Sequence, residues 1–487
     1  MIDIQVRIHD RFSVEFKVGY VVRKELKENN FMMNTWIFVP NNLGINSFTY
    51  TKNSFYRDVT SNIRLITPIY QLSEVADSQA LPFMFLEGAF NELAVENSKE
   101  NLDDFEYQIK MFTSIVRSSL RREATNVVQI TDEAERREGI NRFIRNIEKI
   151  TTRYRDLEAI LQRPGVPSLA LNYFSFGDEF LSNLTEYHVY RLLNLLRCKE
   201  GENVYSEFSP SLMTIVRKEI DYKISKGFKV IQKNSPDSNR AVVFRMRLLN
   251  KYAEGHLFLN ASRKKDGRLA EQVYYSVAAG LSMIFATTIA FSFQQKYGNF
   301  TIPLFVALVV SYMLKDRIKE LTRFYFVHRL SRKYFDNKTT ISIKENPVGW
   351  IKEGVDYITE KRVPEEVMKM RDRSDLLEAD NRGAEEKIIL YRKLVRIDGK
   401  ALDENNQYEI AGINDIFRFN VSNFVLKMDN PEIPLAVPSP DGGYEVVNGE
   451  RIYYINFLIQ FQYDGKINYK RFRVLMSRTG IEGIEKF

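Results

Sequence analysis

The chain has little cysteine and histidine and none of the common short motifs for catalysis or nucleotide binding. Its single cysteine, Cys198, excludes an intrachain disulfide and a zinc site built from several cysteines of one chain. The four histidines, His9, His188, His256 and His328, stand far apart without metal-ligand spacing. A P-loop, a glycine-rich dinucleotide turn, a nucleophile elbow and a paired-histidine motif are all missing. We therefore expect a non-enzymatic protein with no catalytic residues, cofactor or metal ion.

The first residues also lack the apolar run of a secretory signal peptide, because Asp3, Arg7, Asp10 and Arg11 interrupt it. Together with the single cysteine, this predicts that the soluble parts lie in a reducing cytosol. Low-complexity tracts are missing too, and a composition of 44% hydrophobic and 27% charged residues is ordinary for a folded protein. A chain of 487 residues is long enough for two or three domains.

Charge is missing from one long stretch of the sequence, residues 273–295. As a helix, its first 21 residues would be about 31 Å long, which matches a hydrocarbon core of about 30 Å. A second uncharged run, residues 297–314, would be about 27 Å long. Lys296, Gly298 and Asn299 interrupt the apolar pattern between them, as a turn requires. The sequence predicts a two-helix transmembrane hairpin.

The flanks of this hairpin are basic, whereas its turn carries only Lys296. Because basic segments stay on the cytosolic side, we expect two spans of a cytoplasmic (inner) membrane, in a bacterial cell, with both termini cytosolic. We predict that the same cations bind anionic lipid headgroups; they are Arg263, Lys264, Lys265, Arg268, Lys315, Arg317, Lys319, Arg323, Arg329, Arg332 and Lys333. No nucleic-acid-binding module is recognisable, so nucleic acid is not an expected partner.

Small residues recur at helical spacing in both apolar runs. Ser282, Ala286 and Ala290 form one stripe, and Ala307 and Ser311 form another. Such stripes let membrane helices approach closely, here within the hairpin or between subunits. The runs contain no ionisable residue, so we do not expect one hairpin to transport ions by itself.

The remaining pattern predicts an α+β membrane protein with five segments. The first 20 residues alternate apolar and polar side chains, strand-like pieces follow near 35–39 and 63–70, and residues 1–75 are predicted to form a β-rich cytosolic domain. Residues 391–487 contain the turn signals Asp398-Gly399, Asn448-Gly449 and Asp464-Gly465, which indicate an antiparallel β domain, with prolines between 431 and 440 marking a loop. The other segments are a helical cytosolic domain at 76–260, with helices near 178–197, 212–226 and 241–256, the hairpin with its flanks at 261–335, and a charged helical linker at 336–390.

Apolar residues repeat every seven positions between Ile140 and Leu161, with others at the intermediate positions. This pattern fits either a coiled-coil seam between subunits or one helix that packs inside a bundle. Nearby, the Gly-Asp-Glu-Phe segment at 177–180 is preceded by Phe176. A β-hairpin that binds a nucleotide phosphate through such a segment needs a pair of glycines, so that the phosphate can approach the backbone. We expect the segment to form an acidic first turn of a helix instead.

These patterns favour a membrane-anchored cytosolic sensor, scaffold or effector that acts through protein–protein interaction at the inner face of the membrane. Its expected partners are the bilayer and a protein, with a homo-oligomer as a further possibility. Two alternatives stay open. One is an oligomeric effector that permeabilises the membrane, and the other is an enzyme whose site is assembled between domains.

Overall fold

The computed structural model describes residues 2–199, 202–374, 376 and 386–487; the side chains of residues 199, 202–203 and 327–333 lie outside this description. The chain forms two compact units. One, here called the α+β unit, comprises Met1–Ile63, Leu259–Gln407 and Gly412–Phe487. The other, the helical unit, comprises Arg64–Phe258 and Tyr408–Ala411. Helices together with antiparallel sheets confirm the predicted α+β class.

A sheet of eight strands dominates the α+β unit, in the order β14-β13-β12-β3-β8-β7-β6-β5. Every neighbouring pair in it is antiparallel. The strands are β3 (Asn29–Val39), β5 (Asn260–Lys265), β6 (Asn337–Ile343), β7 (Asn346–Ile358), β8 (Lys387–Ile397), β12 (Tyr453–Tyr463), β13 (Lys466–Ser477) and β14 (Gly480–Lys486). A smaller sheet has the order β1-β2-β9-β4, with β1 (Ile2–Asp10), β2 (Ser13–Val21), β9 (Gly412–Asn420) and β4 (Val59–Leu65).

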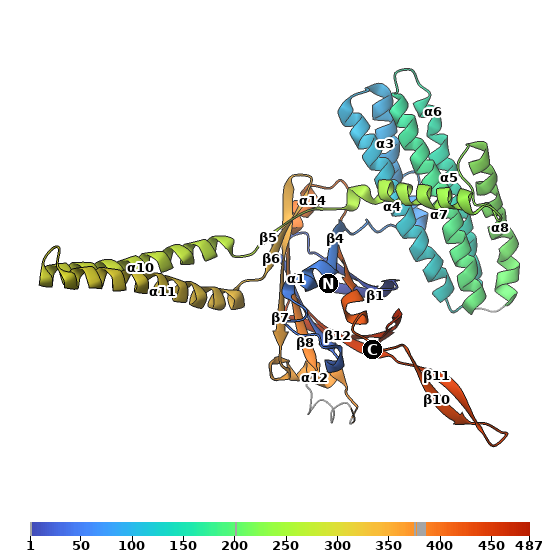
Figure 1. Ribbon diagram of the computed structural model, residues 1–487. Coiled ribbons are helices and arrows are strands. Elements are labelled where there is room, and N and C mark those ends of the chain that lie inside the picture. Colours follow the sequence, from blue (N-terminus) through green and yellow to red (C-terminus); the bar gives the residue numbers. More distant parts are fainter. Residues whose placement is uncertain (1, 200–201, 375, 377–385) are drawn as a thin grey trace. The chain divides into compact units, whose positions relative to one another are not determined.

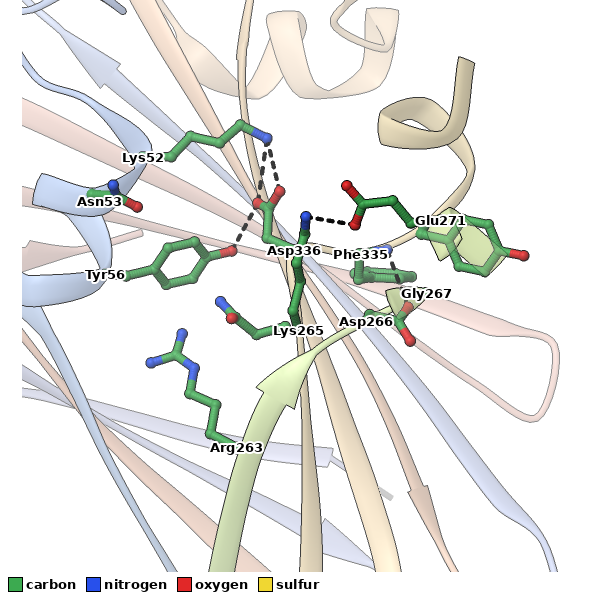
Figure 2. A pocket seen from close by; sticks show the side chains of 12 residues that line it. Lys52, Asn53, Tyr56, Arg263, Lys265, Asp266, Gly267, Glu271, Phe335 and Asp336 are labelled. Atoms are coloured by element: carbon green, nitrogen blue, oxygen red, sulfur yellow. Dashed lines mark hydrogen bonds and ion pairs between the residues drawn. The ribbon is translucent and has the colours of Figure 1, made fainter. Parts of the chain in front are cut away.

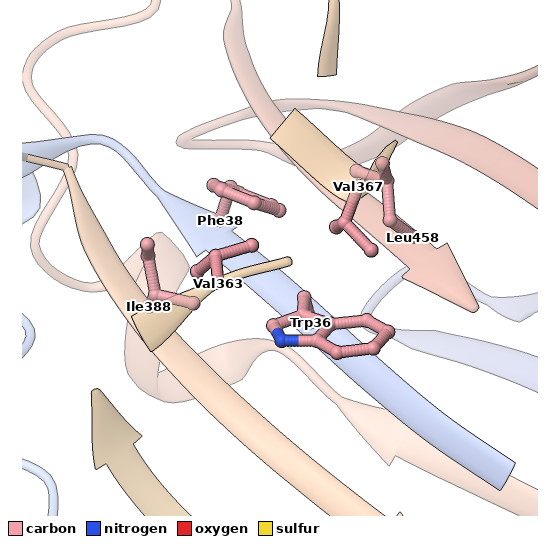
Figure 3. Packing of buried hydrophobic residues seen from close by; sticks show 6 residues of the cluster. All are labelled: Trp36, Phe38, Val363, Val367, Ile388 and Leu458. Carbon is pink, nitrogen blue, oxygen red and sulfur yellow. The ribbon is translucent and has the colours of Figure 1, made fainter. Parts of the chain in front are cut away.

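Aromatic side chains pack the two sheets against each other. The Phe16 ring of the small sheet lies 5.2 Å from the Phe457 ring of the large sheet and stacks on Phe417 at 4.8 Å. Period-two alternation along β2 directs Phe16 and its neighbours inward, which makes a sandwich core. The opposite face of the large sheet is covered by α12 (Glu365–Arg371), whose Val367 packs near Trp36 (Figure 3).

Strands from the two ends of the sequence share these sheets. The strand β3 lies between β12 and β8, and β2 pairs with β9. The structure therefore corrects the expected separation into β domains at 1–75 and 391–487. It also corrects the linker expected at 336–390, because β6 and β7 lie there, followed by η3 (Glu360–Arg362) and α12. Charged residues stand among the apolar residues of β7 and interrupt the alternation by which a strand is recognised in a sequence. Residues 375 and 377–385 of that segment lie outside the described residues.

One of the three expected turns is confirmed. Asp464 and Gly465, with φ of 53° and 72°, connect β12 to β13 as a tight hairpin does. Asp398 instead caps α14 (Gly399–Glu404), and Gly449 lies inside β11 (Tyr444–Glu450).

Two of the prolines expected to mark a loop, Pro434 and Pro438, are part of a strand, β10 (Glu432–Pro438), which pairs with β11 in a separate two-stranded ribbon. Within this ribbon, alternate N–H groups of β10 point away from β11. A proline, which lacks an N–H group, is tolerated at such edge positions. Pro434 and Pro438 occupy positions of this ladder opposite Asn448 and Tyr444.

The helical unit is a bundle around a long helix, α4. Its helices are α2 (Leu72–Val75), α3 (Leu81–Val95), α4 (Lys99–Gln129), α5 (Glu133–Asp156), α6 (Glu158–Leu161), α7 (Ser168–Lys199), α8 (Glu202–Ser225) and α9 (Pro236–Glu254), followed by η2 (Gly255–Leu257). Ser98 and Asp132 cap α4 and α5 by accepting backbone N–H bonds. The helices predicted near 178–197, 212–226 and 241–256 correspond to α7, α8 and α9.

The heptad positions between Ile140 and Leu161 are buried inside this unit. Tyr154 stacks on Phe174 of α7 at 5.0 Å and donates a hydrogen bond to its carbonyl oxygen at 3.1 Å. The stripe is therefore covered by helices of its own chain. Of the two alternatives, the structure supports the helix that packs inside a bundle and not the coiled-coil seam.

Candidate functional site

Two long helices, α10 (Arg268–Tyr297) and α11 (Ile302–Lys333), run alongside each other as a hairpin (Figure 1). Strand β5 leads into α10 and α11 leads into β6, its neighbour in the large sheet. Gly267, at φ 69°, precedes α10, and a Cβ there would approach the Tyr334 ring within 2.9 Å. Both the left-handed backbone and this contact favour glycine. At the far end, Gly298 has φ 76° and its N–H closes the last turn of α10.

Within the described residues, α10 alone is long and apolar enough to cross a membrane, and only 11% of its most apolar 18-residue stretch is buried. This finding supports a membrane association through one helix. The second of the two expected spans, on α11, is not apolar over a comparable length.

Apolar side chains point outward around both helices. Phe291 is 70% exposed and Ile284 62% exposed on α10, and Phe305 is 67% exposed on α11. In water, this much contiguous apolar surface is unfavourable and marks a membrane or protein interaction site. Further exposed large side chains on these helices are Leu269, Val273, Val277, Leu281, Met283, Phe293, Tyr297, Ile302, Val306, Leu308, Val309, Val310, Tyr312, Met313, Leu314, Leu321, Phe324 and Tyr325.

Hydroxyl groups on these helices bond to their own helix. Thr287 donates to the Met283 carbonyl at 2.9 Å, and Thr288 donates to the Ile284 carbonyl at 2.8 Å. Ser282 and Ser311 do the same to Ala279 and Leu308 at 2.8 and 3.3 Å. Such self-contained bonding suits an environment without water. It also leaves these hydroxyls less suited to line an aqueous pore.

Small side chains lie where the helices meet. Ser282 of α10 is buried, as are Ala307 and Ser311 of α11. Ala286 and Ala290, predicted in the same stripe, are half-buried. Whether these residues pack helices inside a membrane stays a prediction.

The register between the helices does not align the two uncharged runs with each other. The Tyr274 ring lies 4.9 Å from the Phe326 ring, and the Arg323 guanidinium lies over the Tyr275 ring at 4.3 Å. The charged part of α11 therefore lies beside the first apolar part of α10. An apolar run measured on one helix alone cannot reveal this offset.

The predicted lipid-binding cations fall into separate groups. Arg263, Lys264 and Lys265 lie on the edge strand β5, and Arg268 begins α10. Lys315, Arg317, Lys319 and Arg323 follow the apolar part of α11. The side chains of Arg329, Arg332 and Lys333 lie outside the described part of the chain.

A pocket of about 600 Å³ opens at the base of the hairpin (Figure 2). Asp336 accepts bonds there from Lys52 at 3.0 Å and from the Tyr56 hydroxyl at 2.9 Å. Burial and the Asp336 carboxylate raise the pKa of Tyr56. Arg263 pairs with Glu353 at 3.4 Å and Lys265 with Glu271 at 2.8 Å. The lining charges thus largely neutralise one another. Sequence reasoning missed Lys52, Tyr56 and Asp336 because they come from distant segments.

A buried ionic cluster lies between the two sheets. Lys393 pairs with Asp415 at 2.5 Å and with Glu353 at 3.4 Å, and the Ser61 hydroxyl donates to Asp415 at 2.6 Å. Burial alone would lower the pKa of Lys393, but the two carboxylates hold it above its usual value. Because Lys393 is 0% exposed, it does not reach solvent as a catalytic lysine would.

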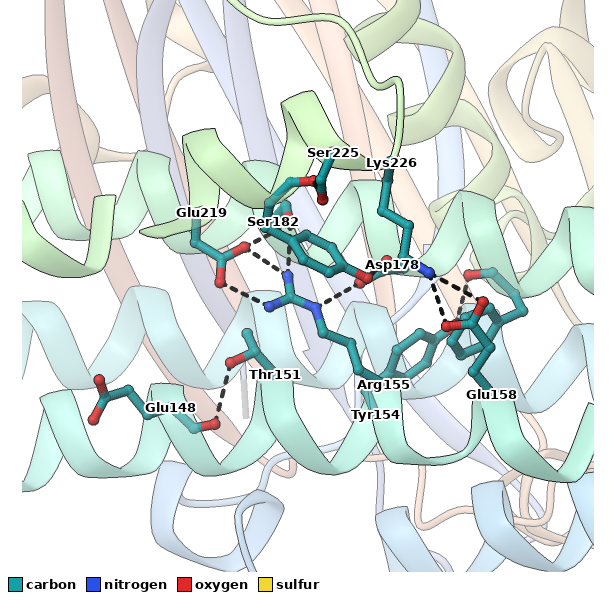
Figure 4. A network of polar contacts seen from close by, with 12 residues as sticks. Glu148, Thr151, Tyr154, Arg155, Glu158, Asp178, Ser182, Glu219, Ser225 and Lys226 are labelled. Carbon is teal, nitrogen blue, oxygen red and sulfur yellow. Dashed lines mark hydrogen bonds and ion pairs between the residues drawn. The ribbon is translucent and has the colours of Figure 1, made fainter. Parts of the chain in front are cut away.

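The helical unit holds a second polar network (Figure 4). Arg155 of α5 bonds to Asp178 at 3.1 Å and to Glu219 at 2.7 Å, and it lies 3.5 Å from the Tyr222 ring centroid. Asp178 is in the middle of α7, which corrects the acidic first turn expected at 177–180. At Gly177, a Cβ would collide with the Tyr154 hydroxyl, so helix packing explains this glycine. The network joins α5, α7 and α8.

Among the described residues, no group of three or more His, Cys, Asp or Glu side chains is arranged to hold a metal ion. Comparison of the chain with protein-family models, with curated proteins and with solved structures found no match.

Proposed function

We propose that the protein is a membrane-anchored sensor, scaffold or effector, held in the bilayer by α10 and α11. The observation that carries this proposal is the outward apolar surface of the hairpin, together with hydroxyl groups that bond within their own helices. Lipid would cover the apolar side chains, whose exposure to water is unfavourable. The α+β and helical units then act at the membrane surface.

The connectivity supports one side of the membrane for both units. The two ends of the hairpin continue into β5 and β6, which pair in one sheet. The basic residues of α11 favour the cytosolic side of a cytoplasmic membrane. Lys296 and Asn299 give the hairpin a polar tip, and a polar tip is better placed at the far surface than inside the bilayer. We therefore propose two crossings, with both termini cytosolic.

A protein partner is the second part of the proposal. The ribbon of β10 and β11 carries Leu435, Tyr444 and Val446, each more than half exposed. Exposed apolar side chains that cluster in this way are typical of binding surfaces. Crosslinking of the full chain in its membrane, followed by mass spectrometry, would identify what contacts this ribbon.

Carbonate extraction of membranes tests the anchor. The wild-type chain is expected to stay in the membrane pellet. The double variant Phe305→Asp/Val309→Asp should move substantially to the soluble fraction, because each aspartate near the bilayer centre costs about 3 kcal/mol. The variant Leu435→Asp/Val446→Asp places the same two charges on the ribbon and should stay in the pellet. Recovery of the wild-type protein in the soluble fraction would refute the proposal.

A further inference from the structure

We propose that the hydrocarbon boundary crosses the hairpin at Met283 of α10 and Leu314 of α11, and that Lys315, Arg317 and Lys319 bind phosphates of anionic phospholipids just outside it. This inference rests on the proposed membrane insertion. It moves the boundary about 15 Å along α10 from Val273, where the uncharged run begins.

The contact between Tyr275 and Arg323 sets the level of every other residue along the pair. In an antiparallel pair with the same rise per residue, eight steps along α10 lead to Met283 and eight steps back along α11 lead to Lys315. Lys315 therefore lies at the level of Met283. A membrane plane that keeps Lys315 at the surface must cross α10 there.

Free energy decides between the two planes. A boundary at Val273 would bring six charged residues into the hydrocarbon: Lys315, Asp316, Arg317, Lys319, Glu320 and Arg323. Near the centre of a bilayer, one charged residue costs roughly six times the free energy that one aliphatic residue gains. Within the described part of the chain, one ion pair forms among them, between Arg317 and Glu320 at 3.2 Å. Burying Val273, Val277 and Leu281 cannot offset this cost.

The residues at the new boundary have the chemistry of a lipid interface. Lys315 lies 4.0 Å from the Tyr312 ring centroid. A tyrosine at the headgroup level with a nearby cation is typical of membrane surfaces. Lys315, Arg317 and Lys319 against Asp316 and Glu320 leave an excess of positive charge, and each cation near an anionic surface strengthens binding about fivefold.

The cations at the base of the hairpin are too far away to share this role. Arg268 precedes Met283 by fifteen residues, a distance of about 22 Å along the helix. That is about twice the Debye length of about 10 Å in 0.1 M salt. Lys264 lies on β5, before the helix begins.

The apolar part of α11, residues 302–314, is about 20 Å long, shorter than a full hydrocarbon core of about 30 Å. Lys315 and Lys296 at its two ends can extend their side chains toward the headgroups, and the bilayer can thin locally. With the boundary at Leu314, the tip reaches the far surface where the extension of these side chains and local thinning together make up the missing length of about 10 Å.

Two environment-sensitive probes separate this inference from the anchor itself. Single cysteines at Val273 or Phe291, in the full chain with Cys198→Ser, are labelled with a nitrobenzoxadiazole dye and reconstituted into vesicles of phosphatidylcholine and phosphatidylglycerol. Quenchers on the acyl chains should quench the dye at 291 and not at 273. Quenching at both positions overturns the boundary but keeps the anchor. Quenching at neither position refutes the anchor.

Matched charge variants test the phosphate contacts. Removal of two charges in Lys315→Gln/Lys319→Gln should weaken the preference of the reconstituted full chain for phosphatidylglycerol over phosphatidylcholine as its neighbouring lipids by about 30-fold, from about fivefold per cation. The variant Lys264→Gln/Arg268→Gln removes the same charge and should change this preference less than about threefold. Equal losses in both variants, or no loss in the first, would overturn the proposed contacts.

Discussion

At the scale of single residues, the charges buried in the sandwich matter most for stability. Lys393 depends on Asp415 and Glu353, because its ammonium group has no access to water. Removing one partner of a buried pair leaves a charge without compensation and costs more than the pair itself contributes. Both tryptophans, Trp36 and Trp350, belong to the α+β unit, so their fluorescence reports its unfolding.

The variant Asp415→Asn should lower the free energy of unfolding of the α+β unit by about 3 kcal/mol, because it keeps the shape of the side chain but removes its charge. Tryptophan fluorescence in a urea titration measures the change. The double variant Asp415→Asn/Lys393→Met should recover part of the loss, because the buried ammonium group is gone and Glu353 still pairs with Arg263. A double variant less stable than the single one would contradict the account.

A buried histidine makes the helical unit sensitive to acid. Burial lowers the pKa of His188 to about 3, and Arg191, Arg117 and Arg121 add to the effect. The unfolded chain binds the proton near pH 6.5, so stability should fall as pH drops below that value, by about 2 kcal/mol at pH 5. Hydrogen exchange of α7 amides measures it. The variant His188→Leu should lose this share of the pH dependence, and an unchanged dependence would argue against a neutral buried His188.

Residue patterns predicted burial well only where the residues are apolar. The alternation along β8 directs Tyr391, Lys393 and Val395 to the same face, so period two was a usable signal for an inward lysine. Its partner Asp415 lies on a strand of the other sheet, and no local pattern joins the two. The pocket residues Lys52 and Asp336 escaped prediction for the same reason.

At the scale of elements, the heptad stripe of α5 shows that a helix can be predicted correctly while its packing partner stays open. The periodicity predicts the helix and its buried face, but not which surface covers that face. In the structure, helices of the same chain cover it.

The variant Ile147→Ala should therefore lower the stability of the helical unit by about 2–4 kcal/mol, because it opens a cavity in the bundle. Hydrogen exchange of α5 and α7 amides measures the loss, with the exposed Lys149→Ala as the control on the same helix. The molecular mass by light scattering in detergent should stay the same in both variants. Dissociation of an oligomer in Ile147→Ala alone would instead support a seam between subunits.

The two helices of the hairpin follow local signals, namely uncharged runs and a turn, whereas their place in a membrane stays a prediction. The turn between Tyr297 and Ile302 overlaps the predicted turn at 296–299. The register could have been counted back from the turn, because both helices rise equally per residue, and the contact between Tyr274 and Phe326 agrees with this count. That register decides which cations can meet lipid.

At the scale of the whole molecule, antiparallel pairing joins distant segments into one unit, although the sequence analysis assigned them to separate domains. The α+β unit combines strands from both ends of the chain, and the helical unit is inserted between them in sequence. Strands such as β2 and β12 can be recognised from their own alternation, whereas β7 and β10 were not. The pairing of β3 with β8 and β12, however, is decided by packing across hundreds of residues, which composition and turn signals do not encode.

The accessibility of the hairpin tip tests the central claim, that α10 and α11 lie in the bilayer with both units on one side, most directly. Asn299→Cys in a Cys198→Ser background provides a thiol at the tip, and the wild-type chain provides its own exposed Cys198 in the helical unit. Intact cells producing each protein are treated with a membrane-impermeant maleimide. We predict that the thiol introduced at position 299 is labelled from outside and that Cys198 reacts only after permeabilisation. A tip that stays unlabelled until the cells are opened, or a Cys198 that reacts in intact cells, would contradict this topology.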